Sequence, residues 1–114
     1  MEKSAYKRLN IEVDEKTDYV KVHDLLMFIG KYKKKRGAEI MFNRLPPVVK
    51  NGMVPMNMSS RRGKRAFYAN NETVCAIVRH VVPRIKQDYR WKRQMLILFK
   101  CMSEDMMIEI MPTT

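Results

Sequence analysis

The sequence predicts a small α+β domain, with N-terminal strands, a helix pair, a β-hairpin and two C-terminal helices around one core. Short segments with alternating apolar residues are interleaved with segments whose apolar residues recur at helical spacing. Proline, glycine and asparagine separate these segments. At 114 residues, 46% of them hydrophobic, the chain is long enough for a single domain, 1–114, with its own core.

The N-terminal part predicts two antiparallel strands. Leu9, Ile11 and Val13 alternate with polar residues, which indicates a strand over residues 7–13. A polar turn follows, and residues 19–22 have the aromatic and β-branched content of a second strand.

A pair of helices is expected next. Asp24 begins a short apolar helix, and Gly30 is suited to be its left-handed C-terminal residue. After a basic connector, a second helix covers residues 35–45 and ends before Pro46 and Pro47. Two helices joined by a short turn have the outline of a helix-turn-helix.

The middle of the chain predicts a β-hairpin. Asn51 and Gly52 lie between β-forming residues, the pattern typical of a type I′ turn. Pro55 indicates that the returning strand lies at a sheet edge or ends early, and residues 66–69 form one more strand. With the basic loop 58–64 at its tip, this hairpin would resemble a wing, and a plain β-meander is the alternative.

The C-terminal part predicts two helices. Asn70 or Asn71 caps the first, and Pro83 breaks the chain before a second helix over residues 84–102. The methionine-rich tail, residues 106–111, alternates in polarity and is a candidate for a last strand.

Charge is the strongest indication of function. The net charge is +11, and residues 19–100 hold nineteen Lys or Arg and only four acidic residues, a net charge of +15. Such a concentration of like charge opposes folding, so an anionic partner is expected. We expect that partner to be nucleic acid, with duplex DNA favoured over RNA.

Three clusters of Lys and Arg are the candidate nucleic-acid-binding residues. Phosphate binding requires scattered cations on a shared surface, and these clusters lie between the helices of the pair, after the hairpin and on the C-terminal helices. They are Lys31, Lys33, Lys34, Lys35 and Arg36; Arg61, Arg62, Lys64 and Arg65; and Arg79, Arg84, Lys86 and Arg90. Arg44, on the second helix, is the candidate for contact with base edges. The runs 31–36 and 61–65 also suit nuclear import signals.

Enzyme, cofactor and metal-binding classes lack their sequence signals. His23 and His80 are far apart, and Cys75 and Cys101 have no zinc-site spacing, so both cysteines are expected to be buried apolar residues. The sequence has no glycine-rich phosphate loop, no run long enough to span a membrane and no signal-peptide pattern at its start. We therefore predict an intracellular protein without catalytic activity, cofactor or metal, nuclear in a eukaryotic host and otherwise cytoplasmic.

The aromatic residues carry a further expectation. Phe67 and Tyr68 are consecutive on a strand, so at least one of them points into the core, and the pair could stack on unpaired bases. Trp91 is expected to be a packing residue.

Several of these segments together resemble the KilA-N and Bro-N group of DNA-binding modules. The resemblance covers residues 19–82 and rests on Tyr19–Leu26, the basic helix pair after Gly30, and Gly63–Tyr68 before a capped helix. It implies a strand leading into a helix pair, a hairpin and a closing apolar helix. It also implies DNA binding and a viral origin.

The sequence thus predicts a nucleic-acid-binding protein that regulates transcription or associates with a genome. Two alternatives remain open. One is an RNA or single-strand binder that uses Phe67 and Tyr68. The other is a protein that self-associates through methionine-rich surfaces, as a homo-oligomer, and recruits an acidic partner with its charge.

Overall fold

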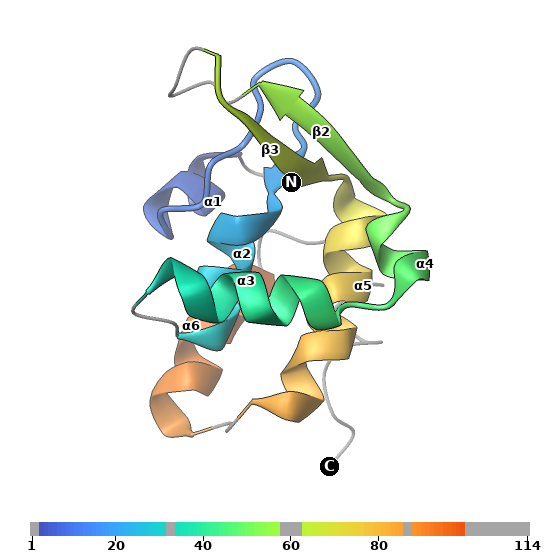
Figure 1. Ribbon diagram of the computed structural model, residues 1–114. Helices are drawn as coiled ribbons and strands as arrows, with labels where there is room; N and C mark the ends of the chain where they lie inside the picture. Colours follow the sequence, from blue (N-terminus) through green and yellow to red (C-terminus); the bar gives the residue numbers. More distant parts are fainter. Residues whose placement is uncertain (1–2, 32–33, 58–62, 86–87, 100–114) are drawn as a thin grey trace.

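The computed structural model describes residues 3–31, 34–57, 63–85 and 88–99 of the chain (Figure 1). Its elements are α1 (Lys3–Arg8), β1 (Val20–Lys21), α2 (Val22–Gly30), α3 (Lys35–Arg44), α4 (Pro47–Lys50), β2 (Met53–Asn57), β3 (Arg65–Ala69), α5 (Asn71–Val81), the 3-10 turn η1 (Val82–Arg84) and α6 (Tyr89–Phe99). Within these residues the strands form one antiparallel sheet in the order β1-β3-β2. The predicted α+β class is confirmed.

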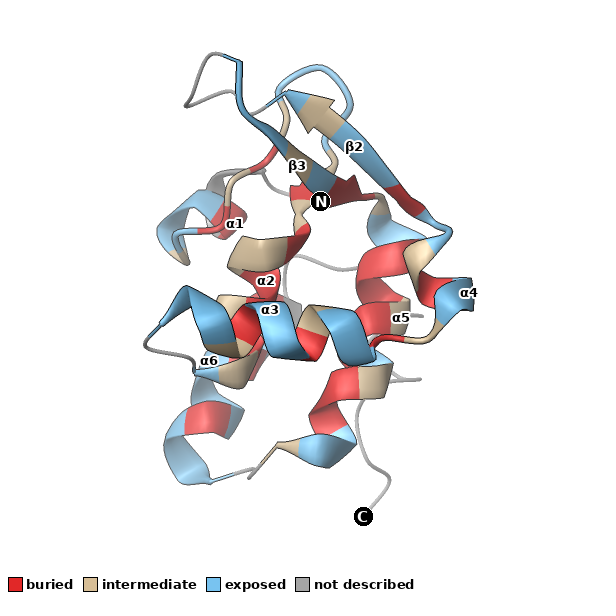
Figure 2. Cartoon of the chain, in the orientation of Figure 1, coloured by how far each residue is buried: buried red, intermediate tan, exposed pale blue. Residues whose placement is uncertain are grey.

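The core is built around helix α2. Val22, Leu25, Leu26 and Ile29 on this helix are fully buried, and each such aliphatic side chain contributes about 1.5–3 kcal/mol when it leaves water. The apolar stripe of α5 is equally buried, and the two stripes belong to one apolar cluster. Figure 2 shows buried residues along α2 and α5, while α3 is mostly exposed and is buried at Ala38 and Met41.

The strand predicted over residues 7–13 is wrong. Its first two residues end helix α1, and Asn10 then adopts the left-handed conformation, with φ of 60°. The Asn10 N–H bonds to the Lys7 carbonyl and the Ile11 N–H to the Tyr6 carbonyl, the pattern that closes a helix C-terminus. Only Val13 forms a β-bridge, antiparallel to Val20 as expected. The alternation reflects burial, because Ile11 and Val13 are both buried in a chain that is otherwise irregular.

The boundaries of α2 also differ from the prediction. The helix begins at Val22, two residues before Asp24, and Gly30 is its last helical residue. Lys31 instead takes the left-handed position, with φ of 53°, and its N–H reaches the carbonyls of Met27 and Phe28. Two strand residues remain in β1, where residues 19–22 were expected.

Helix α3 has the predicted extent to within one residue, and Pro46 and Pro47 follow its end as expected. The hairpin turn predicted at Asn51 and Gly52 is wrong. Pro47 occupies the first position of helix α4, where its fixed φ favours helix, and this draws the next three residues into a helical turn. Asn51 has φ of −63° and so lacks the positive φ that a type I′ turn needs.

The hairpin is formed by β2 and β3, which pair from Met53 with Ala69 to Asn57 with Arg65. The connection includes residues 58–62, which lie outside the described residues. Pro55 is on the edge strand, as predicted, because β3 is the central strand. Tyr68 is fully buried and Phe67 is 40% exposed, so one member of the aromatic pair does point into the core.

The C-terminal helices follow the prediction with one shift. Asn70 caps α5, because its side chain accepts a hydrogen bond of 2.9 Å from the Thr73 N–H. After η1, helix α6 begins at Tyr89, five residues later than expected, because Asp88 caps it through the Trp91 N–H at 2.8 Å. The end of this helix beyond residue 99 and the strand proposed at 106–111 lie outside the described residues, as does Cys101, while Cys75 is buried as predicted.

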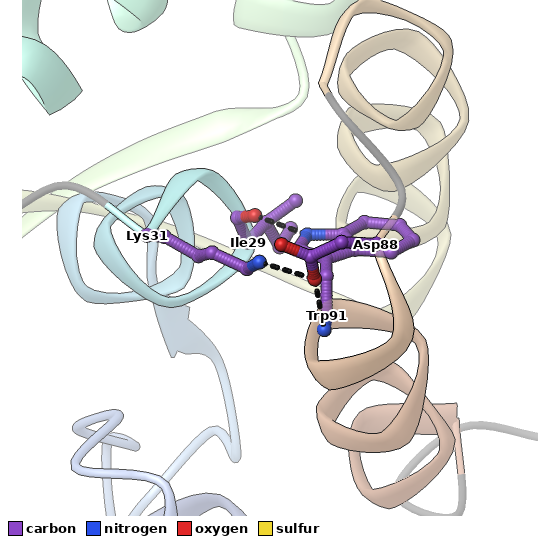
Figure 3. Close-up of polar contacts among 4 residues, drawn as sticks. All are labelled: Ile29, Lys31, Asp88 and Trp91. Atoms are coloured by element: carbon purple, nitrogen blue, oxygen red, sulfur yellow. Dashed lines mark hydrogen bonds and ion pairs between the residues drawn. The ribbon is translucent and has the colours of Figure 1, made fainter.

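Trp91 fixes α6 against the end of α2. The last carbonyls of a helix lack partners within it, and the Trp91 indole N–H donates a 2.6 Å hydrogen bond to one of them, on Ile29 (Figure 3). The side chain is only 3% exposed. Trp91 is therefore a packing residue with a specific polar contact.

We expect Trp91→Phe to lower the free energy of unfolding by about 1–3 kcal/mol, because it leaves a buried carbonyl without its donor. Urea unfolding followed by circular dichroism measures the change. The control is Tyr89→Phe on the same helix, because Tyr89 is 74% exposed and this variant should change stability by less than about 0.5 kcal/mol. Equal stability of the two variants would contradict the role given to the indole.

Candidate nucleic-acid interface

A cleft of about 960 Å³ lies between the helix pair and the hairpin. Residues of α2, the first half of α3 and both hairpin strands line it, with the chain around Leu9 and Asn10 at one end. The same hairpin is the predicted wing, and α2 and α3 are the predicted helix pair. The cleft is thus where the two candidate DNA-binding elements meet.

Three of the predicted cationic residues converge on this cleft. Lys35 comes from α3. Arg65 is the first residue of β3, thirty positions further along the chain, and Lys64 directly precedes it. Lys21 also lines it and was not predicted, because it is an isolated basic residue in the sequence. The cleft also contains two carboxylates, Asp24 and Glu39, so cations outnumber anions there by four to two.

Asp24 is already engaged by its own surroundings. One carboxylate oxygen accepts a 3.0 Å hydrogen bond from the Glu12 N–H, and the other lies 3.8 Å from the Lys21 ammonium group. Asp24 therefore ties the irregular segment before β1 to the helix pair.

Lys34 and Arg36 are exposed at the start of α3, next to Lys35. The first turn of this helix has no acidic residue, so these cations lie at the positive end of the helix dipole. That arrangement is unfavourable in the isolated protein, and a bound anion would relieve it. Arg44 is exposed at the opposite end, roughly 14 Å away along the helix axis, where the dipole favours a cation.

The remaining predicted residues are elsewhere. Lys31 forms an ion pair with Asp88 at 2.7 Å, at the junction of α2 and α6 (Figure 3). Lys31 and Arg90 both line a second, smaller hollow of about 450 Å³ there.

Arg79 lies on the last turns of α5, and the Arg84 guanidinium in η1 donates to the His80 carbonyl at 2.6 Å. Lys33, Arg61, Arg62 and Lys86 lie outside the described residues.

An aromatic stack that no sequence pattern indicated joins the helix pair to the hairpin. The ring of Phe42 on α3 lies between His23 on α2 and Phe67 on β3, with centroid distances of 5.3 and 5.4 Å and interplanar angles of 24° and 28°. The Lys50 ammonium group is 5.4 Å from the centre of the same ring. Stacked rings of this kind add to the packing energy, so the stack holds α3 and β3 at a fixed spacing across one side of the cleft.

Burial is the main cause of a lowered pKa at His23, which lines the cleft and stacks on Phe42. The cationic Lys21 and Lys35 lower it further, and Glu39 and Asp24 oppose the change.

Tyr68, by contrast, is a core residue. Its hydroxyl donates to the Glu12 carboxylate, and burial, followed by this hydrogen bond, raises the pKa of the phenol.

Comparisons of the chain with known protein families, curated proteins and solved structures find no match. The resemblance to the KilA-N and Bro-N group therefore stays a prediction from the residues of this chain. None of the helices in the described ranges has the length and apolar composition that crossing a bilayer requires.

We expect His23 to make the fold less stable in mild acid. Its folded-state pKa lies below the ordinary value of 6.5, so the unfolded chain binds the proton more readily. The stability due to neutral His23 is complete above pH 6.5 and is lost as the pH falls from there through the folded-state pKa. His23→Phe keeps a ring against Phe42 but binds no proton, so its unfolding free energy should fall less between pH 7 and pH 5.

Urea titrations at several pH values measure this difference. His80→Phe on α5 is the comparison: burial and the nearby Arg84 lower the pKa of His80 as well, but this variant leaves the contribution of His23 to the pH dependence in place. An identical pH dependence in the wild type and in His23→Phe would contradict the prediction.

Proposed function

We propose that this protein binds double-stranded DNA, without catalysis, through the helix pair and the hairpin on either side of the cleft. The observation that carries the proposal is the convergence of Lys35, Lys64 and Arg65 on one cleft from two separate elements. Cations that meet from different parts of the chain on a shared surface are what phosphate binding requires.

Helix α3 is suited to the major groove. Its inner side is buried through Ala38 and Met41, while its outer side is exposed. The exposed positions Arg36, Ile40, Asn43 and Arg44 follow helical spacing along one face. Arginine pairs with guanine and asparagine with adenine in that groove, and an apolar side chain suits the methyl group of thymine.

The hairpin is suited to the DNA backbone. Lys64 and Arg65 are exposed where β3 begins, and the Arg65 guanidinium is held near the edge strand by a 3.5 Å hydrogen bond to the Pro55 carbonyl. Because the aromatic stack links β3 to α3, phosphates held by the hairpin would fix how α3 enters the groove. In this proposal the protein acts inside the cell, as a single domain, in transcription regulation or genome association.

We expect Lys64→Glu combined with Arg65→Glu to weaken duplex binding and to lower its salt dependence. Each lost phosphate contact reduces the slope of log K against log salt by about 0.9, so the slope should fall by about 2. Fluorescence anisotropy of a labelled 20-base-pair duplex at several salt concentrations measures both quantities, with single-stranded DNA and RNA as competitors.

The control is Lys92→Glu combined with Arg93→Glu, which changes the net charge by the same amount on the exposed side of α6. Equal losses in the two double variants would show that only total charge matters and would contradict an interface at the cleft. Stronger competition by single-stranded RNA than by duplex DNA would contradict duplex DNA as the partner.

A further inference from the structure

The cleft is lined by apolar as well as by charged residues. Phe28, Met27 and Ala38 line it from the helix pair, and Pro55 and Phe67 line it from the hairpin. The Phe67 ring packs against Phe42 at a centroid distance of 5.4 Å, yet the residue as a whole is still 40% exposed. An aromatic ring with this much free surface, in a cleft of about 960 Å³, can accept another flat ring.

A base in an undistorted double helix does not offer its face to that ring. Its faces are covered by its neighbours, and a protein in either groove of such a helix meets only base edges and phosphates. An aromatic side chain binds the face of a base, so its ligand must have left the stack.

The polar groups around the cleft match the rest of such a ligand. Lys35 lies on the α3 side and Lys64 and Arg65 on the hairpin side, where they can neutralise the phosphates that flank one nucleotide. The Glu39 carboxylate lines the same cleft and is an acceptor for the exocyclic amino group of a base.

We infer that the cleft binds one unpaired nucleotide of DNA, with its base against Phe67 and its phosphates between α3 and the hairpin. This inference rests on the proposed DNA binding and extends it. The protein would then prefer duplexes that carry a bulged or unpaired base over fully paired ones.

The test compares two labelled duplexes of equal length, one fully paired and one with a single bulged 2-aminopurine. We expect the bulged duplex to bind about tenfold more tightly, the scale that stacking of one base on an aromatic ring provides. The 2-aminopurine fluorescence should rise on binding, because the base leaves its quenching neighbours. Equal affinity for the two duplexes, or unchanged fluorescence, would overturn the inference.

Phe67→Leu tests the ring itself, since it keeps an apolar contact for Phe42 but removes the flat surface. We expect the ratio of the two affinities to fall close to one. Leu96→Ala on α6, a site 48% exposed, is the control and should keep the wild-type ratio. An unchanged ratio in Phe67→Leu would overturn the assignment. The fluorescence of the wild-type complex stands independently of how either variant folds.

The outcomes separate the inference from the proposed function. Binding of paired duplex without preference for the bulge leaves the proposed function and overturns the inference. Binding of neither duplex overturns both. A deoxynucleoside monophosphate at millimolar concentration serves as a competitor for the cleft. If it lowers the affinity for the bulged duplex no more than the affinity for the paired duplex, the cleft does not bind the unpaired nucleotide and the inference fails.

Discussion

Helix α2 can be buried on nearly all sides only because its neighbours satisfy its C-terminal end. Its four aliphatic side chains from Val22 to Ile29 are fully excluded from water, and α3, α5, β1 and β3 all contact it. The carbonyl groups at its C-terminus then need partners in a largely dry environment. Trp91 supplies one from α6, and the left-handed Lys31 residue supplies another from the backbone. The short helix is thereby fixed as the centre against which the other elements pack.

This constraint also determines the shape of the candidate interface. Because α2 fixes α3 on one side and β3 on another, a cleft remains between the helix pair and the hairpin. The stack of His23, Phe42 and Phe67 connects all three elements along that cleft. Cations distant in the sequence therefore meet at one place, while Lys31 is diverted to the ion pair with Asp88. The interface we propose is smaller than the full set of basic residues in the sequence.

The sequence predicted those elements whose signals are local. Helix α3 was predicted to within one residue, because Pro46 and Pro47 stop it, and α5 was predicted from its asparagine cap. The failures come from competition between signals. Pro47 starts helix α4, and this helix takes the place of the hairpin turn predicted at Asn51 and Gly52. The apolar alternation at residues 9–13 marks residues that are buried, although they do not form a strand. The cleft and its aromatic stack depend on residues far apart in the chain, such as Phe42 and Phe67, and no local pattern encodes their contact.

We propose that duplex DNA binds at the cleft between α3 and the hairpin. Amide chemical-shift mapping of nitrogen-15-labelled protein, titrated with a 20-base-pair duplex, tests this interface because it reports on every element at once. We expect the largest changes at residues 35–44 and at the start of β3, with small changes along α6. If the largest changes lie instead at the end of α5, in η1 and along α6, the interface is formed by the basic residues of those helices, such as Arg79, Arg84 and Arg90, and the proposed interface is contradicted.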